Sequence, residues 1–224
     1  MTSLPSPRIF LTNLLNTLST IPAPPTDDIT TTTTTNPLKN LRSQHRALLS
    51  TLHVLFPPPM LLQSLDLLDR HLVTRLIPGP PASESPGGKS IVVYQIRSSQ
   101  QPRSRFNHGV SSSTNTPVYT VRLRAWNCTC AAFTFSAFPG SSAAFTPELV
   151  HGDGVPEVTR AGDDEGSWEF GGLSSDGSNS DENLPCCKHL LACLLAEKWE
   201  AVLGAYVNVR EISLDEMAGV AGEN

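Results

Sequence analysis

The chain has 224 residues, which is enough for one sizeable domain or two small ones with a core that needs no disulfide scaffold. Charged residues make up only 17%, below the roughly 25% that is usual, and 19 prolines gather in stretches that indicate linkers. No apolar run approaches the roughly 18 to 20 residues that span a bilayer, and Asn13 and Asn16 interrupt any signal-peptide core, so we expect a soluble protein that is not secreted.

The net charge of −5 is unevenly distributed along the chain. Residues 148–182 carry ten acidic side chains against one basic side chain, Arg160, which gives this stretch a local charge of −9. Residues 89–124 contain six basic side chains and no acidic one. The average charge therefore does not exclude contact with nucleic acid, because a small positive region remains available for it.

The first third of the chain predicts helices. Residues 1–36 are expected to be mostly flexible, with a short helix near 9–18 followed by a Pro- and Thr-rich tract. From Leu38 to Phe56 the apolar residues recur at helical spacing, which predicts a helix. Asn36 and Pro37 precede them and suit the N-cap and the first turn of this helix. Three prolines end this helix, and a second amphipathic helix is predicted over 60–77. Residues 37–77 thus predict a helical hairpin, followed by a linker at 78–88.

The hydrophobic period then changes from about 3.6 to 2, which predicts strands over 91–97 and 118–126 that pair in an antiparallel hairpin. In the second strand the alternation places Tyr119 and Val121 on one face, and Arg122, Arg124 and Trp126 on the other. Residues 139–183 predict a disordered acidic insertion, 184–203 a helix, 205–212 a short strand, and 213–224 a C-terminal tail. The fold class is α+β.

Four metal-ligand residues stand at the predicted ends of elements. Cys128 and Cys130 close the second strand, and Cys187 and His189 open the helix near 184. Zinc prefers four nitrogen or sulfur ligands in a tetrahedron, and a strand-end pair facing a helix-start pair can supply them. A disulfide within the Cys-x-Cys pair would be badly strained, and five cysteines fit thiols used as ligands in a reducing compartment. We therefore expect a structural Zn²⁺ site at Cys128, Cys130, Cys187 and His189.

Other cysteines and histidines compete less well for the site. Cys186 is an alternative to Cys187, although the Cys-x-His spacing favours Cys187. Cys193 lies one turn beyond His189 and is better interpreted as a small packed residue. The three histidines of the predicted hairpin are interpreted as surface or interface residues rather than ligands; they are His45, His53 and His71.

Residues 131–186 separate the two ligand pairs, and this long gap does not exclude the site. Lengthening a closing loop from about 10 to about 56 residues costs roughly 1.5 kcal/mol of entropy. A structural zinc supplies an apparent free energy of about 10–16 kcal/mol. An acidic insertion between the ligand pairs is therefore tolerable.

The motif C-T-C-A-A-F at 128–133, followed by C-K-H-L-L-A-C at 187–193, resembles the SWIM zinc finger, whose pattern is Cys-x-Cys, a variable gap and Cys-x-His. With this resemblance, residues 89–138 and 184–212 would form a SWIM module, an antiparallel β-hairpin plus helix around the zinc, preceded by the α-helical hairpin. The hairpin sequence L-Q-S-L-D-L-L-D-R at 62–70 is in addition similar to SWIM subunits of the eukaryotic Shu complex. The long acidic insertion departs from the compact family pattern and puts DNA contact through the loop in doubt.

The resemblance implies a nuclear, non-enzymatic accessory subunit. Such proteins bind a RecA-like recombinase paralogue and promote recombinase filament assembly on single-stranded DNA during homologous recombination repair. The alternative that SWIM fingers allow is a DNA- or protein-binding module in transcription or chromatin regulation. If single-stranded DNA is contacted, the basic hairpin is the expected surface, through Arg97, Arg103, Arg105, Arg122 and Arg124.

An enzyme is not expected from this sequence. The side chains of Cys187 and His189 would point in different directions, because the two residues are two apart at a helix start. This is a poor arrangement for a nucleophile and its base. A fourth protein ligand would also close the metal against water activation. Neither a membrane nor a small-molecule substrate is expected as a partner.

Overall fold

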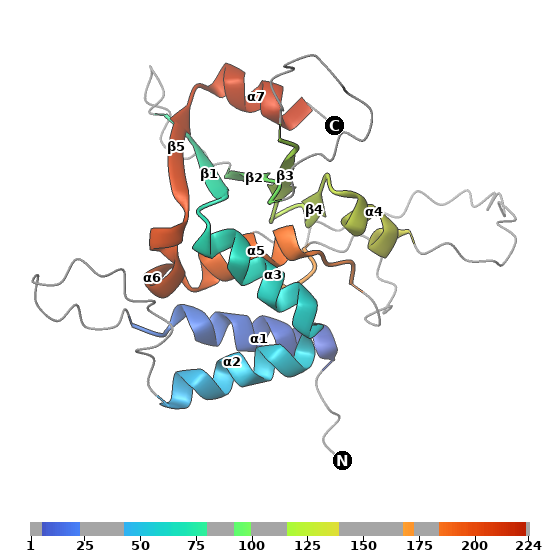
Figure 1. Cartoon of the computed structure of the whole chain (residues 1–224), viewed down its shortest axis with the longest axis vertical. Coiled ribbons are helices and arrows are strands. Elements are labelled where there is room, and N and C mark those ends of the chain that lie inside the picture. Colours follow the sequence, from blue (N-terminus) through green and yellow to red (C-terminus); the bar gives the residue numbers. More distant parts are fainter. Residues whose placement is uncertain are drawn as a thin grey trace, which may run out of the picture.

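The computed structural model describes residues 6–22, 43–79, 92–99, 116–138, 168–172 and 184–222. Within them the fold is α+β, with helices on both faces of a mixed five-stranded sheet, as Figure 1 shows. No helix in these ranges is both long enough and apolar enough to span a bilayer.

The sheet has the strand order β4-β3-β2-β1-β5. Neighbouring strands are antiparallel except β1 and β5, which run parallel at one edge. The register places Tyr94 opposite Val121, and Val121 opposite Cys128, so these three side chains share one face. The strands are β1 (Val73–Pro78), β2 (Val93–Arg97), β3 (Val118–Arg122), β4 (Asn127–Cys128) and β5 (Asn208–Ile212).

One helix, α5 (Lys188–Lys198), forms the centre of the molecule. It lies between the sheet and a group of helices formed by α1 (Pro7–Ser19), α2 (Ser43–Leu55) and α3 (Pro58–Asp69), as Figure 1 shows. Every residue of α5 from His189 to Ala196 is buried, which is the pattern of a helix enclosed on all sides. Short helices α6 (Glu200–Leu203) and η2 (Gly204–Tyr206) then lead into β5.

The opposite face of the sheet is covered in part by the C-terminal helix α7 (Leu214–Gly222). Met217 of α7 forms a small apolar cluster with Leu76, Val93 and Ile212 from three strands. The segment predicted as a tail therefore contains a packed helix. The remaining short helix, α4 (Ala131–Ala137), directly follows the Cys-x-Cys motif.

The predicted helix over 60–77 is wrong beyond Asp69. Helix α3 ends there, His71 takes a positive φ of 51°, and the chain continues as β1. Leucines four residues apart, Leu68, Leu72 and Leu76, suit one helical face, but an even spacing also suits one strand face. Pairing with β2 and β5 decides for the strand, so the helical hairpin is formed by α2 and α3 alone.

The short helix predicted near 9–18 is confirmed as α1, but the expected flexibility is wrong for the described residues 6–22, which are part of the core. Ser6 caps α1 by accepting from the N–H of Ile9 at 3.4 Å, and Leu15 and Leu18 are fully buried against α5. Tight packing of an amphipathic face stabilises a helix that would be marginal alone. Residues 23–42, with the predicted cap at Asn36, lie outside the described residues.

Part of the predicted disordered insertion is also packed. Within 139–183 the structure describes residues 168–172, and Phe170 is only 3% exposed. Its ring lies 4.5 Å from that of Trp126, and its N–H donates to Thr12 Oγ1 at 3.0 Å. The Arg8 guanidinium forms an ion pair with Glu169 at 3.0 Å and donates to the carbonyl of Gly172. This segment therefore ties α1 to the turn before β4.

The second predicted strand ends earlier than expected. Strand β3 stops at Arg122, and a turn over 123–126 precedes β4, with Trp126 at φ 46°. The turn rotates the indole of Trp126 into the core, where it is 6% exposed, instead of onto the arginine face that the alternation predicted. Several predicted segments lie largely outside the described residues. They are the linker 78–88 apart from residues 78 and 79, the hairpin tip 98–116 apart from residues 98, 99 and 116, and the insertion residues 139–167 and 173–183.

Replacing Phe170 tests whether the segment at 168–172 belongs to the fold. We expect Phe170→Ala to lower the free energy of unfolding by about 3–5 kcal/mol, because it removes a buried ring from between Phe56 and Trp126. Phe135→Ala is the matched control, since that ring is 76% exposed and its loss should change stability by no more than about 0.5 kcal/mol. Urea unfolding measures both, and equal effects would contradict this packing.

Candidate metal centre

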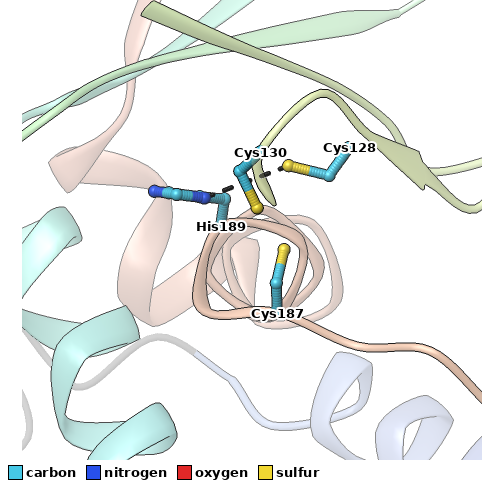
Figure 2. A group of neighbouring side chains, drawn as sticks. All are labelled: Cys128, Cys130, Cys187 and His189. Carbon is cyan, nitrogen blue, oxygen red and sulfur yellow. Dashed lines mark hydrogen bonds between the residues drawn. The ribbon is translucent and has the colours of Figure 1, made fainter. Parts of the chain in front are cut away.

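The candidate metal centre lies where β4, α4 and α5 meet. Cys128 ends β4, Cys130 is the N-cap of α4, and Cys187 is the N-cap of α5. His189 lies in the first turn of α5, so two neighbouring helix starts and one strand end supply all four side chains (Figure 2). All four residues are buried.

The geometry suits a tetrahedral ion. One ligand atom from each of the four residues lies within 4.8 Å of all the others, and Cys128 Sγ is 3.9 Å from His189 Nδ1. Zinc bonds of about 2.0–2.3 Å place the ligands of a tetrahedron about 3.5–3.8 Å apart, so small side-chain movements suffice. These buried residues could bind a metal ion such as zinc, and within the described parts of the chain no other such group of His, Cys, Asp or Glu occurs.

Backbone N–H groups at the helix starts point at two of the sulfurs. The N–H of Phe133 donates to Cys130 Sγ at 3.3 Å, and the N–H of Leu190 donates to Cys187 Sγ at 3.5 Å. Three thiolates and one neutral imidazole around a divalent ion leave a net charge of about −1. Such hydrogen bonds and the positive end of α5 stabilise that charge in a buried site.

Hydrogen bonds from the surrounding elements hold the two halves of the site in place. Thr120 and Thr129 exchange two of them, from the N–H of Thr120 to Thr129 Oγ1 at 3.0 Å and from the N–H of Thr129 to the Thr120 carbonyl at 3.1 Å. On the other side, Trp126 Nε1–H donates to the carbonyl of Pro185 at 2.8 Å. The hydroxyl of the buried Ser64 donates to the carbonyl of Lys188 at 2.9 Å. Contacts from β3, α3 and the turn before β4 therefore hold both ligand pairs, and Pro185, at the end of the 56-residue gap, takes part in one of them.

The sulfurs strongly influence one another. A hydrogen bond from Cys128 lowers the pKa of Cys130 well below its usual range, and the same bond raises the pKa of Cys128 well above it. A bond with Cys128 lowers the pKa of Cys187, but the bond to Cys130 and burial outweigh it and raise that pKa to about 11. The hydrogen bonds among the sulfurs therefore favour the deprotonated form of Cys130 and the protonated forms of Cys128 and Cys187, by shifting the pKa of each thiol in these directions.

The competing cysteines lie outside the cluster. The N–H of Cys186 donates to Ser136 Oγ at 3.3 Å, and its own Sγ is directed to the Cys187 carbonyl at 3.8 Å. Cys193 is fully buried in α5, and burial raises the pKa of its thiol well above the usual value. Of the three hairpin histidines, His53 is exposed, His71 stacks on Tyr206 at 5.6 Å, and the side chain of His45 lies outside the described residues.

The predicted DNA-contact arginines are only partly described. Arg97 and Arg122 share the sheet face opposite Tyr94 and Val121, because strand side chains alternate. Arg97 is exposed at the end of β2, whereas Arg122 is half-buried and donates to the carbonyl of Val220 in α7 at 3.5 Å. Arg124 is exposed in the turn after β3. Arg103 and Arg105 lie outside the described residues.

Sequence reasoning missed the residues that support the ligands. The sequence placed Tyr119 on one strand face with Val121 but gave it no role at the site, yet its ring lies over the His189 imidazole, with the ring centres 4.5 Å apart. This contact fixes the imidazole with Nδ1 toward the sulfurs. One feature of the sequence could have indicated this role. Tyr119 lies on the same strand face as Val121, and Val121 pairs with Cys128, so Tyr119 faces the side of the sheet that carries the site.

Comparisons with known proteins add no family assignment. No family model matches this sequence, and no curated protein is similar enough to match.

Exchanging single cysteines tests the ligand set. We expect the wild-type chain to carry one zinc ion in native mass spectrometry and Cys187→Ser to carry none, because a hydroxyl is a far weaker zinc ligand than a thiolate. Cys186→Ser is the matched control and should retain one ion, since Cys186 lies outside the cluster. Loss of zinc from Cys186→Ser together with retention in Cys187→Ser would reverse the assignment.

Metal uptake should release protons. Because the pKa of Cys128 and that of Cys187 are raised, both thiols are protonated at pH 7 and each must lose its proton to bind. Zinc affinity should therefore rise with pH across the neutral range, with about two protons released per ion. Titration calorimetry in buffers of different ionisation enthalpy counts these protons, and a count near zero would contradict the protonation pattern.

Proposed function

We propose that this chain is a non-enzymatic, zinc-binding accessory subunit of homologous recombination repair. It binds a RecA-like recombinase paralogue in the nucleus and promotes recombinase filament assembly on single-stranded DNA. The observation that carries the proposal is the closed set of three sulfurs and one imidazole joining β4 and α5, in the order Cys-x-Cys and Cys-x-His. That order is the one on which the resemblance to SWIM zinc fingers rests.

The chemistry of the site favours a structural role for zinc. Zinc supplies a rigid cross-link when bound by four protein ligands, and catalytic zinc sites instead keep one position open for water or substrate. All four side chains here are buried, and their neighbours hold them through backbone and hydroxyl hydrogen bonds. The residues of this chain therefore position β4, α4 and α5 relative to each other.

The sheet face that carries Arg97 offers a surface for DNA. Helix α7 covers the part of this face around Leu76, Val93 and Ile212, and its Val220 carbonyl accepts from Arg122. Arg97 lies opposite the start of β3, and Arg124 lies in the turn after the end of β3. Both are exposed cations that could contact phosphates at separate points. Aromatic side chains of the sheet do not contribute stacking there, because Tyr94 and Trp126 are buried on the other side.

Complex formation is the first test of this function. The chain is co-expressed with RecA-like recombinase paralogues and analysed by native mass spectrometry, which reports metal content and stoichiometry together. We expect a heteromer containing one zinc ion, and we expect Cys187→Ser to abolish both the zinc and the heteromer. The proposal is overturned if no co-expressed paralogue forms a heteromer and a pull-down with the zinc-loaded chain from cells with damaged DNA recovers promoter-binding or chromatin factors, which would support a transcriptional module.

DNA contact is tested by the salt dependence of binding to single-stranded DNA. Replacing Arg97 and Arg124 by Ala should reduce the slope of log affinity against log salt by about 1.4, since each phosphate contact to a single strand contributes roughly 0.7. Arg46→Ala in α2, within the helical layer, is the charge-matched control and should leave the slope unchanged. An unchanged slope in the double variant would remove this face as the DNA surface.

A further inference from the structure

A groove with apolar and acidic lining residues lies between α3 and the segment that follows the end of α5, whereas the metal ligands of α5 are at its start. Its cavity has a volume of about 320 Å³ and is formed by α3 and the short segment α6–η2. Four leucines and a tyrosine make up its apolar part, and two carboxylates complete the lining; the residues are Leu62, Leu65, Leu68, Leu203, Tyr206, Asp66 and Asp69.

The apolar part of the groove continues onto the surface. Leu62 is 60% exposed at its edge, although most other leucines of α3 are buried in the core. A groove of this size, with an exposed leucine beside it and polar residues around it, is typical of a site that receives side chains of another protein. The groove therefore offers contact for apolar side chains that project from one face of a helix.

The charges of the groove select the partner. Asp66 and Asp69 lie in the last turn of α3, where the helix dipole is itself negative and acidic residues are unfavourable. Asp66 is in contact with Arg70, at 3.6 Å, through side chains that are both more than half exposed. The pKa of Tyr206 is raised, first by burial and second by the negative charge of the nearby Asp69. In the part of the chain that the structure describes, no lysine or arginine lines the groove, so its two carboxylates favour a cation.

We propose that this groove docks an amphipathic helix of a partner protein, with leucine-like side chains on one face and lysine or arginine beside them. The apolar side chains would contact Leu62, Leu65 and Leu203. The stem of a lysine or arginine would lie along the leucines while its charged end reaches Asp66 and Asp69. This inference goes beyond the proposed function, because it depends on neither a recombinase nor DNA.

The test uses the full-length, zinc-loaded chain and defined peptides. The probes are fluorescein-labelled 16-residue helical peptides with leucines at positions i, i+3, i+4 and i+7 and flanking lysines, in several registers. Matched peptides carry glutamate in place of each lysine. We expect micromolar binding of at least one lysine peptide in fluorescence anisotropy, weakening with added salt, and binding at least about tenfold weaker for its glutamate counterpart.

Variants of the chain locate the binding. Leu62→Lys and the pair Asp66→Asn with Asp69→Asn should each weaken binding of the lysine peptide by about tenfold or more, and the second should also remove most of its salt dependence. Leu214→Lys and Asp215→Asn on α7 are the controls and should bind normally; Leu214 is 60% exposed, as Leu62 is. All these side chains lie at the surface, so thermal melting should remain that of the wild type.

Three outcomes would overturn the proposal. The first is that no lysine peptide binds at millimolar concentration, and the second is that the glutamate peptides bind equally well. The third is that the concentrated chain forms a dimer that Leu62→Lys dissociates, which would make a second copy of this chain the occupant. Failure of recombinase binding would leave the peptide result unaffected, so the two proposals fail separately.

Discussion

The cluster of Cys128, Cys130, Cys187 and His189 is the constraint on which the rest of the fold depends. It joins the end of β4 to the start of α5, and α5 contacts both the sheet and the helical group. An ion bound there would fix the central helix relative to the sheet edge with about 10–16 kcal/mol of apparent free energy, comparable to the whole stability of a typical domain. The contacts of Ser64 with Lys188 and of Tyr119 with His189 position α5 relative to α3 and the sheet, and Trp126 ties the turn before β4 to Pro185 just ahead of α5.

The clustering of these four side chains could be predicted because the pattern that marks them is local. Cys-x-Cys and Cys-x-His each fix two ligands within three residues, and Asp, Glu or Ser at these positions would have given no such pattern. Burial of Trp126 could be expected from the residue type, but the alternation gave the wrong face of the strand for it, because a single residue at φ 46° reverses that face. The sequence could not place Phe170, since an isolated aromatic residue in a Gly-, Ser- and Asp-rich stretch has no periodicity from which a partner can be inferred.

The fold class was predicted correctly as α+β, whereas the extent of the sheet was not. A five-stranded mixed sheet replaces the expected hairpin, because residues 73–78 form a strand and not the end of a helix. The local spacing of leucines permits both structures, and only pairing with two distant strands decides between them. Likewise α1 and α7 are amphipathic segments that are buried against α5 and against the sheet. The sequence alone does not show that those two surfaces lie next to them.

The parallel pairing of β1 with β5 has a consequence for synthesis of the chain. β1 is complete at residue 78, but the strand that covers its outer edge ends only at residue 212. During translation at about 5–20 residues per second, that edge waits roughly 7–27 seconds with unpaired N–H and C=O groups. A nascent chain in this interval can pair with its neighbours on the same messenger RNA, so the protein is vulnerable to aggregation until β5 has left the ribosome.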